Sequence, residues 1–133
     1  MIIKNQMGMH HEFSLFGAQF RVLLPREKTE CTEVLQEIFP PGGEAPLNTH
    51  DDMEQLYLIL EGQGFVVVGD EQGNVCVGDL VFIPRGMTHA IKNTGIGNLV
   101  YLCFDLFPDG YPDEEQTWDA HERVIYEKFG RAS

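Results

Sequence analysis

The chain has 133 residues, a formal net charge of −12 and three cysteines, and this length suffices for one domain whose core needs no disulfide or structural metal. The acidic balance argues against nucleic acid and anionic membranes as partners. No apolar run is long enough to span a membrane, and the N-terminus lacks the apolar segment of a secretory signal. The three cysteines cannot all pair within one chain, so we expect a protein of the reducing cytoplasm.

Residues 1–17, which include the pair His10 and His11, show little pattern, and we expect them to form an N-terminal arm. Short apolar runs separated by Gly, Asp and Asn follow over residues 18–107, a spacing that is typical of an all-β sandwich or barrel. Residues 40–43, Pro-Pro-Gly-Gly, must form a loop. The strands that we expect lie at 18–24, 32–39, 53–60, 64–69, 74–77, 80–83, 89–93 and 98–106.

The pattern changes in residues 108–133. Trp118, His121, Ile125 and Phe129 recur at helical spacing, with acidic residues before them and basic residues at the end, an order that suits the helix dipole. We therefore expect a short C-terminal helix whose apolar face packs on the barrel or on a second subunit. His121 would then be a helix-face residue rather than a metal ligand.

The most informative segment is residues 78–93, with the sequence GDLVFIPRGMTHAIKN. A turn at Gly78 leads into an apolar strand, which ends at Pro84 because proline has no N–H for the sheet. Gly86 can adopt the positive φ of a tight turn, and His89 then begins the next strand.

This segment resembles the second signature of the cupin superfamily, G-x5-P-x-G-x2-H-x3-N, and every fixed position is filled: Gly78, Pro84, Gly86, His89 and Asn93. The resemblance implies a single-domain cupin, which is a jelly-roll β-barrel that holds a ligand in its mouth. It also implies a homodimer, since cupin barrels often pair through their sheets.

Residues 42–62 are similar to the first cupin signature, but two of its metal ligands are replaced. His50 stands at the second histidine position, whereas Asn48 occupies the first and Gln55 occupies the position of the glutamate. Glu54 could take the place of Gln55 if the strand began in a different register. Strand alternation puts the two side chains on opposite faces, and the count back from the closing glycine favours Gln55.

By this resemblance His50, Gln55 and His89 hold one divalent transition metal (Zn, Ni, Fe, Mn or Co), with Asn48 or water completing the set. Each residue also has a plainer role. His89 can be a core imidazole bonded to a backbone carbonyl, Gln55 can hydrogen-bond a histidine, and Asn48 can stabilise its loop. Tyr57 shares a strand face with Gln55, and it can either donate a hydrogen bond to substrate or fill the core. A set without a carboxylate leaves the full positive charge on the metal, which favours an anionic bidentate substrate.

Two interpretations of function stay open. The first is a metal-dependent enzyme, a dioxygenase, decarboxylase, isomerase or lyase, that acts on a small organic acid or a phenol. The second is a non-catalytic cupin that binds a small molecule in a degraded or absent metal site. A metal-free enzyme of the sugar-epimerase type is a third possibility, and the acidic surface argues against it.

Overall fold

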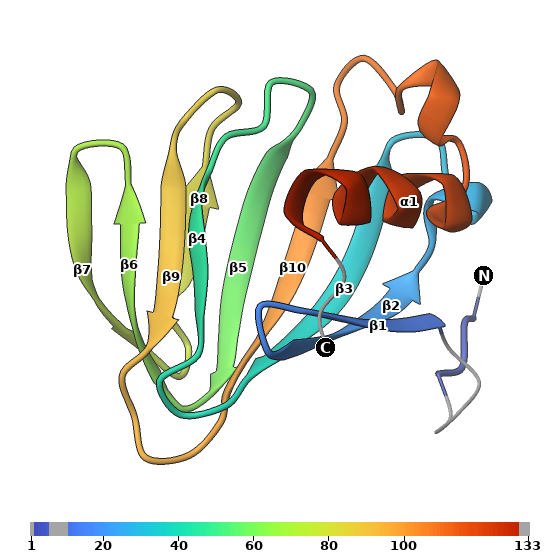
Figure 1. Cartoon of the computed structure of the whole chain (residues 1–133). Helices are drawn as coiled ribbons and strands as arrows, with labels where there is room; N and C mark the ends of the chain where they lie inside the picture. The colour runs from blue at the N-terminus through green and yellow to red at the C-terminus, as the bar shows by residue number, and fades with distance from the viewer. Residues whose placement is uncertain (1, 6–10, 131–133) are drawn as a thin grey trace.

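The computed structural model describes residues 2–5 and 11–130 and contains two antiparallel β-sheets and one α-helix (Figure 1). Within these residues no helix has the length and apolar composition needed to cross a membrane. The elements in chain order are β1 (His11–Leu15), β2 (Ala18–Leu24), the 3-10 helix η1 (Arg26–Lys28), β3 (Thr32–Phe39), β4 (Glu44–Asn48), β5 (Glu54–Glu61), β6 (Gln63–Val68), β7 (Glu71–Cys76), β8 (Leu80–Ile83), β9 (His89–Asn93), β10 (Leu99–Leu106), η2 (Asp113–Glu115) and α1 (Trp118–Phe129).

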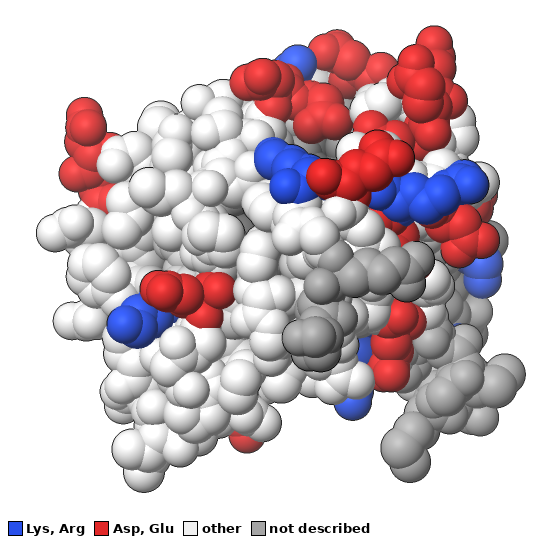
Figure 2. All heavy atoms as spheres, in the orientation of Figure 1, with Lys and Arg blue, Asp and Glu red and all other residues white. Residues whose placement is uncertain are grey.

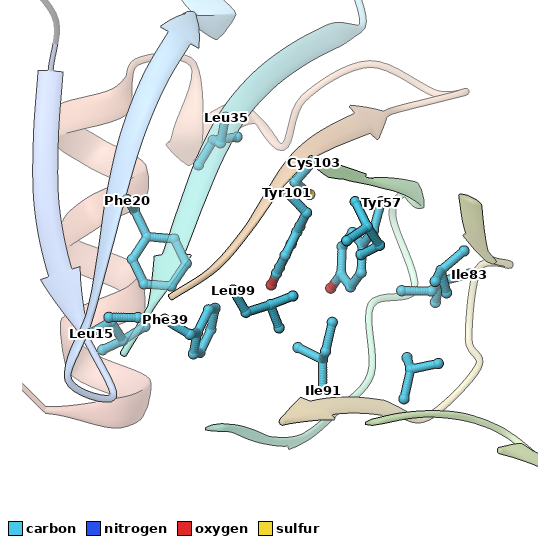
Figure 3. Packing of buried hydrophobic residues seen from close by; sticks show 14 of the residues in the cluster. Leu15, Phe20, Leu35, Phe39, Tyr57, Ile83, Ile91, Leu99, Tyr101 and Cys103 are labelled. Carbon is cyan, nitrogen blue, oxygen red and sulfur yellow. The ribbon is translucent and has the colours of Figure 1, made fainter. Parts of the chain in front are cut away.

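The six-stranded sheet has the order β1-β2-β3-β10-β5-β8, and the four-stranded sheet has the order β4-β9-β6-β7. The expected all-β jelly-roll barrel with a short C-terminal helix is therefore confirmed. Alternate residues of each strand face inward, as in β3, where buried and half-buried positions alternate along all eight residues. Figure 3 shows the resulting core, in which the Tyr57 and Tyr101 rings lie side by side with centroids 4.5 Å apart.

Two strands lie where the sequence predicted none. β1 falls inside the expected N-terminal arm and pairs with β2, because Phe13 and Leu15 alternate with polar residues and reach the core. His10, the other histidine of that arm, lies outside the described residues. β4 contains Pro46, which an edge strand tolerates because one side of it has no partner; β4 is an edge strand of its sheet and pairs with β9 alone.

Helix α1 crosses in front of β10 and β3 (Figure 1) and packs on the barrel. Its N-cap Thr117 accepts a hydrogen bond from the Ala120 N–H. Trp118 belongs to the core cluster, and the half-buried Ile125 and Phe129 pack against it. The helix therefore covers the barrel with the face that the helical spacing predicted.

A buried arginine ties the C-terminal segment to the barrel. Arg26 and Glu33 are 1% and 0% exposed, and Arg26 Nε and Nη2 each donate to a carboxylate oxygen of Glu33 at 2.9 Å. Arg26 Nη1 donates to the Glu115 carbonyl oxygen at 2.7 Å. The guanidinium also lies within 5.3 Å of the ring centroids of Phe107, Tyr111 and Trp118.

We predict that Arg26→Met lowers the free energy of unfolding by about 3–5 kcal/mol, because it leaves the Glu33 carboxylate buried without its partner. Urea denaturation followed by circular dichroism measures this change. The matched control is Arg21→Met, which removes an ion pair with Glu12 whose side chains are 35% and 38% exposed, and which should cost less than about 1 kcal/mol. Equal losses in the two variants would contradict the prediction.

Candidate functional site

A cavity of about 370 Å³ lies inside the barrel and is bounded on one side by α1. Its polar lining includes every side chain that the sequence predicted for the site: Asn48, His50, Gln55, Tyr57 and His89. They come from β4, the loop after it, β5 and β9, so residues from both sheets meet in this cavity.

The two histidines lie side by side, with ring centroids 5.2 Å apart. His89 begins β9, and its Nδ1 lies 3.0 Å from the Met87 carbonyl oxygen. A proton on Nδ1 satisfies that carbonyl and leaves the lone pair on Nε2 for another partner. The loop that carries His50 is held against the β8–β9 turn, because the Gly86 N–H donates to the His50 carbonyl oxygen at 2.7 Å.

Both imidazoles are uncharged at neutral pH. Burial lowers the pKa of His50 to about 4, although the Asp105 carboxylate acts in the opposite direction. Burial also lowers the pKa of His89. The neutral ring is the form that coordinates a metal, so the pair is ready to act as ligands without losing protons.

Asn48 lies between His50 and Lys128 of α1. Its Nδ2 lies 3.4 Å from His50 Nε2, and its Oδ1 accepts hydrogen bonds from Lys128 Nζ at 2.7 Å and from the Thr49 N–H at 2.9 Å. The oxygen that would bind a metal is thus bonded to an ammonium group. For Asn48 to act as a ligand, Lys128 would have to leave it.

Gln55 faces the interior and is 6% exposed, while Glu54 lies on the other face of β5. Gln55 Nε2 donates to Asp105 Oδ1 at 2.8 Å, and no hydrogen bond to a histidine is found for it among the described residues. Its Oε1 lies 3.5 Å from the Tyr57 hydroxyl, which donates to it. Burial raises the pKa of Tyr57 well above its usual value, so this hydroxyl keeps its proton.

Three buried acidic residues that the sequence analysis did not single out lie around this site: Glu33 and Glu37 on β3 and Asp105 on β10. The Tyr101 hydroxyl donates to Glu37 at 2.8 Å, and burial raises the pKa of Glu37 to about 7. Burial and the neighbouring Asp105 carboxylate raise the pKa of Glu33, while the Arg26 guanidinium acts in the opposite direction. The sequence predicted a set of metal ligands without a carboxylate. The motif positions contain none, but Glu37 and Asp105 line the same cavity.

The donor chemistry fits a divalent transition metal, because two neutral imidazoles and an amide oxygen belong to one cavity that also contains carboxylates. A second group lies elsewhere: His11, Asp119 and Glu122 offer ligand atoms within 4.8 Å of one another. Asp119 is exposed and the other two are half-buried, so this group is at the surface between β1 and α1. Figure 2 shows that acidic side chains also gather around η2 and α1.

Other charged, histidine and cysteine side chains lie in or near the barrel. Arg21 on β2 lies outside the cavity and pairs with Glu12 at 2.9 Å. His121 lines the cavity from α1, and its Nδ1 lies 2.7 Å from Glu115. Of the three cysteines, Cys103 is buried in β10, whereas Cys31 and Cys76 are exposed.

The family model for the cupin domain matches residues 35–105. An uncharacterized protein from Methanocaldococcus jannaschii is 35% identical over 80 residues, which are 60% of this chain and 64% of that protein. The oxalate-binding protein of Thermotoga maritima is 33% identical over 64 residues, or 48% of this chain and 53% of that protein. The matched part thus spans less than two thirds of either relative. Oxalate decarboxylase from Bacillus subtilis is 34% identical over 102 residues, or 68% of this chain and 26% of the enzyme.

Solved structures share the fold. A crystal structure from Thermotoga maritima, described as a predicted oxalate decarboxylase, matches with a TM-score of 0.68 and 24% identity over 80% of this chain and 99% of that one. The cupin domain of Cnp3 from Schizosaccharomyces pombe matches with a TM-score of 0.70 and 16% identity over 100% of this chain and 84% of that one. At these identities the likeness concerns the fold alone. Because the family model covers residues 35–105, just over half of the chain, the protein belongs to the cupin family.

Proposed function

We propose that this cupin binds one divalent transition metal in the barrel cavity through His50 and His89, with the Gln55 amide oxygen as a further ligand. The observation that carries the proposal is the pair of neutral imidazoles in one cavity, with the Nδ1 of His89 engaged by a backbone carbonyl. Such an ion supplies Lewis-acid polarisation of a substrate oxygen and, if it is iron, a site for O2.

The proposed ligand of the cavity is a small organic acid that also has an apolar part. Two relatives are named for oxalate, which supports a carboxylate as the group that meets the metal. Oxalate has no apolar surface, however, and much of this cavity is lined by apolar side chains: Phe13, Leu15, Phe16, Phe20, Ile125 and Phe129. A cavity of about 370 Å³ with this lining suits a larger molecule.

One observation favours the second function, a binding protein without metal. Several polar atoms of the site already have partners in this structure: Asn48 Oδ1 accepts from Lys128, Gln55 Nε2 donates to Asp105, and His89 Nδ1 contacts Met87. A cavity with satisfied polar groups can be stable without an ion.

Metal uptake separates these functions. We expect protein purified without a tag, then incubated with Zn, Ni, Fe, Mn or Co and desalted, to retain close to one ion per chain, and His89→Ala to lose it. The control is His11→Ala, which removes a histidine of the surface group and should leave the retained metal unchanged. Wild-type protein that retains none of these metals would exclude the metal centre and favour the binding protein.

Ligand size tests the proposed organic acid. In a series of straight-chain carboxylates titrated into metal-loaded protein, we expect affinity to rise about fourfold per added methylene until the cavity is full. Ile125→Trp fills part of the apolar wall and should remove this increase, whereas Arg123→Trp, an exposed position of the same helix, should not. Oxalate that binds more tightly than every longer acid would contradict the prediction.

We also propose that two copies of the chain associate through the outer face of the six-stranded sheet. Large apolar side chains lie in register across three strands there, as Phe104–Leu56–Phe82 and Leu102–Leu58–Leu80 on β10, β5 and β8. Leu80 and Phe82 are 62% and 50% exposed. An exposed apolar patch of this kind marks an interface, and in a two-fold dimer the same patch is buried on both subunits.

We expect light scattering to report a dimer for the wild type and a monomer for Phe82→Lys, since a charge would be buried in the interface. Ile96→Lys is the control because Ile96 is 103% exposed in a loop away from this sheet face. A wild-type monomer, or a Phe82→Lys dimer, would refute this arrangement.

A further inference from the structure

Asp105 is a buried carboxylate that stands directly opposite Gln55 on the neighbouring strand. In the antiparallel pairing of β10 with β5, Asp105 is the register partner of Gln55. The two side chains are 5% and 6% exposed, both line the cavity, and Gln55 Nε2 lies 2.8 Å from Asp105 Oδ1. The pair therefore forms one amide–carboxylate unit inside the site.

Other polar groups hold this carboxylate in place. The Cys103 thiol donates to Asp105 Oδ1 at 3.2 Å. On its other side β10 pairs with β3, where the register partner of Asp105 is Glu33, and Glu33 is held by two hydrogen bonds of 2.9 Å from Arg26. Asp105 thus lies between Glu33, which Arg26 holds, and Gln55 in a row of neighbouring buried polar residues.

A metal ion in this cavity would need a negative charge close to it. The proposed ligands, two neutral imidazoles and an amide oxygen, provide none, and an uncompensated charge is costly in a buried site. A carboxylate that accepts the amide N–H also polarises the amide and makes its oxygen a better ligand. Partners of this kind fix the orientation of a ligand and raise its affinity for metal.

We propose that Asp105 is a positioning residue of the metal centre: it holds the Gln55 amide by its nitrogen, leaves the amide oxygen for the metal, and supplies the negative charge that the ligands lack. This inference rests on the proposed metal site. It differs from a purely structural role, in which Asp105 only satisfies the Gln55 and Cys103 donors in the core.

The test exchanges the amide and the carboxylate between positions 55 and 105. Affinity for Co²⁺ is measured by titration and by the visible absorption of the bound ion, which reports the ligand geometry. We expect Asp105→Asn to bind Co²⁺ about 10–100-fold more weakly than wild type and to change the spectrum. The double variant Gln55→Glu with Asp105→Asn returns a carboxylate to the unit, and we expect its affinity within about threefold of wild type, as coupled neighbours allow.

The matched control is Glu37→Gln. Glu37 is another buried carboxylate of the same cavity, and it bonds Tyr101 rather than Gln55. Its loss should change Co²⁺ affinity by less than about threefold, because no proposed ligand depends on it. Thermal melts of each variant identify any that fail to fold. If Asp105→Asn alone does not fold, the double variant is compared with wild type, and a Co²⁺ affinity more than about tenfold below wild type overturns the role of Asp105.

The outcomes separate the two proposals. Wild-type affinity in Asp105→Asn, or a double variant as weak as Asp105→Asn, would overturn the role of Asp105 while leaving the metal site intact. Wild-type protein that binds no Co²⁺ would overturn the metal site, and the role of Asp105 with it.

Discussion

The buried pairing of Arg26 with Glu33 connects the two parts of the molecule on which the cavity depends. Arg26 reaches three partners at once: the Glu33 carboxylate in the barrel, the Glu115 carbonyl just before α1, and a cage of aromatic rings. An ion pair this deep contributes to stability only where further contacts offset the cost of its desolvation, as the Glu115 carbonyl and the aromatic rings do here. Without Arg26, Glu33 would remain beside the Asp105 carboxylate with no cation to balance them, so the stability of the barrel and the charge of the site involve the same residues.

The contacts that hold α1 at its start and near its end differ in strength. At its start, Trp118 is 3% exposed and packs on the Arg26 guanidinium, and the Trp118 backbone N–H donates to the Glu27 carboxylate at 2.8 Å. Near its end, Lys128 donates one exposed hydrogen bond of 2.7 Å to Asn48, and water can replace such a contact at little cost. The helix wall of the cavity is therefore held by Trp118 and by the packing of Ile125 and Phe129, and the Lys128 contact adds little to it.

Most of the barrel could be predicted from the sequence because strand alternation is a local property. The same period of two placed Gln55 inside and Glu54 outside, as the structure has them. It could also have identified Glu33 and Glu37, which share a face with Leu35 and Phe39, but a charged residue on an apolar face is explained only by its partner. Those partners come from β10 and η1, and the pairing of β3 with β10 is a long-range feature that no local pattern specifies. Similarly, the sequence did not predict β4 because it contains Pro46. Proline is tolerated in a strand at the edge of a sheet, and the position of a strand in its sheet is not a local property of the sequence.

The distribution of charge in the cavity limits how an organic acid can lie in it. Glu37 and Asp105 are buried in the wall formed by β3 and β10, so a ligand carboxylate placed against them would be repelled. The positive groups available to that carboxylate are the proposed metal, near His50 and His89, and the Lys128 ammonium, which lies close to the same histidines through Asn48. The apolar part of the ligand then faces the rings of Phe16 and Phe129, which pack edge to face with centroids 5.0 Å apart between the β1–β2 turn and α1. In this orientation the acid group of the proposed ligand would lie near the metal and Lys128, and its apolar group would lie against Phe16 and Phe129.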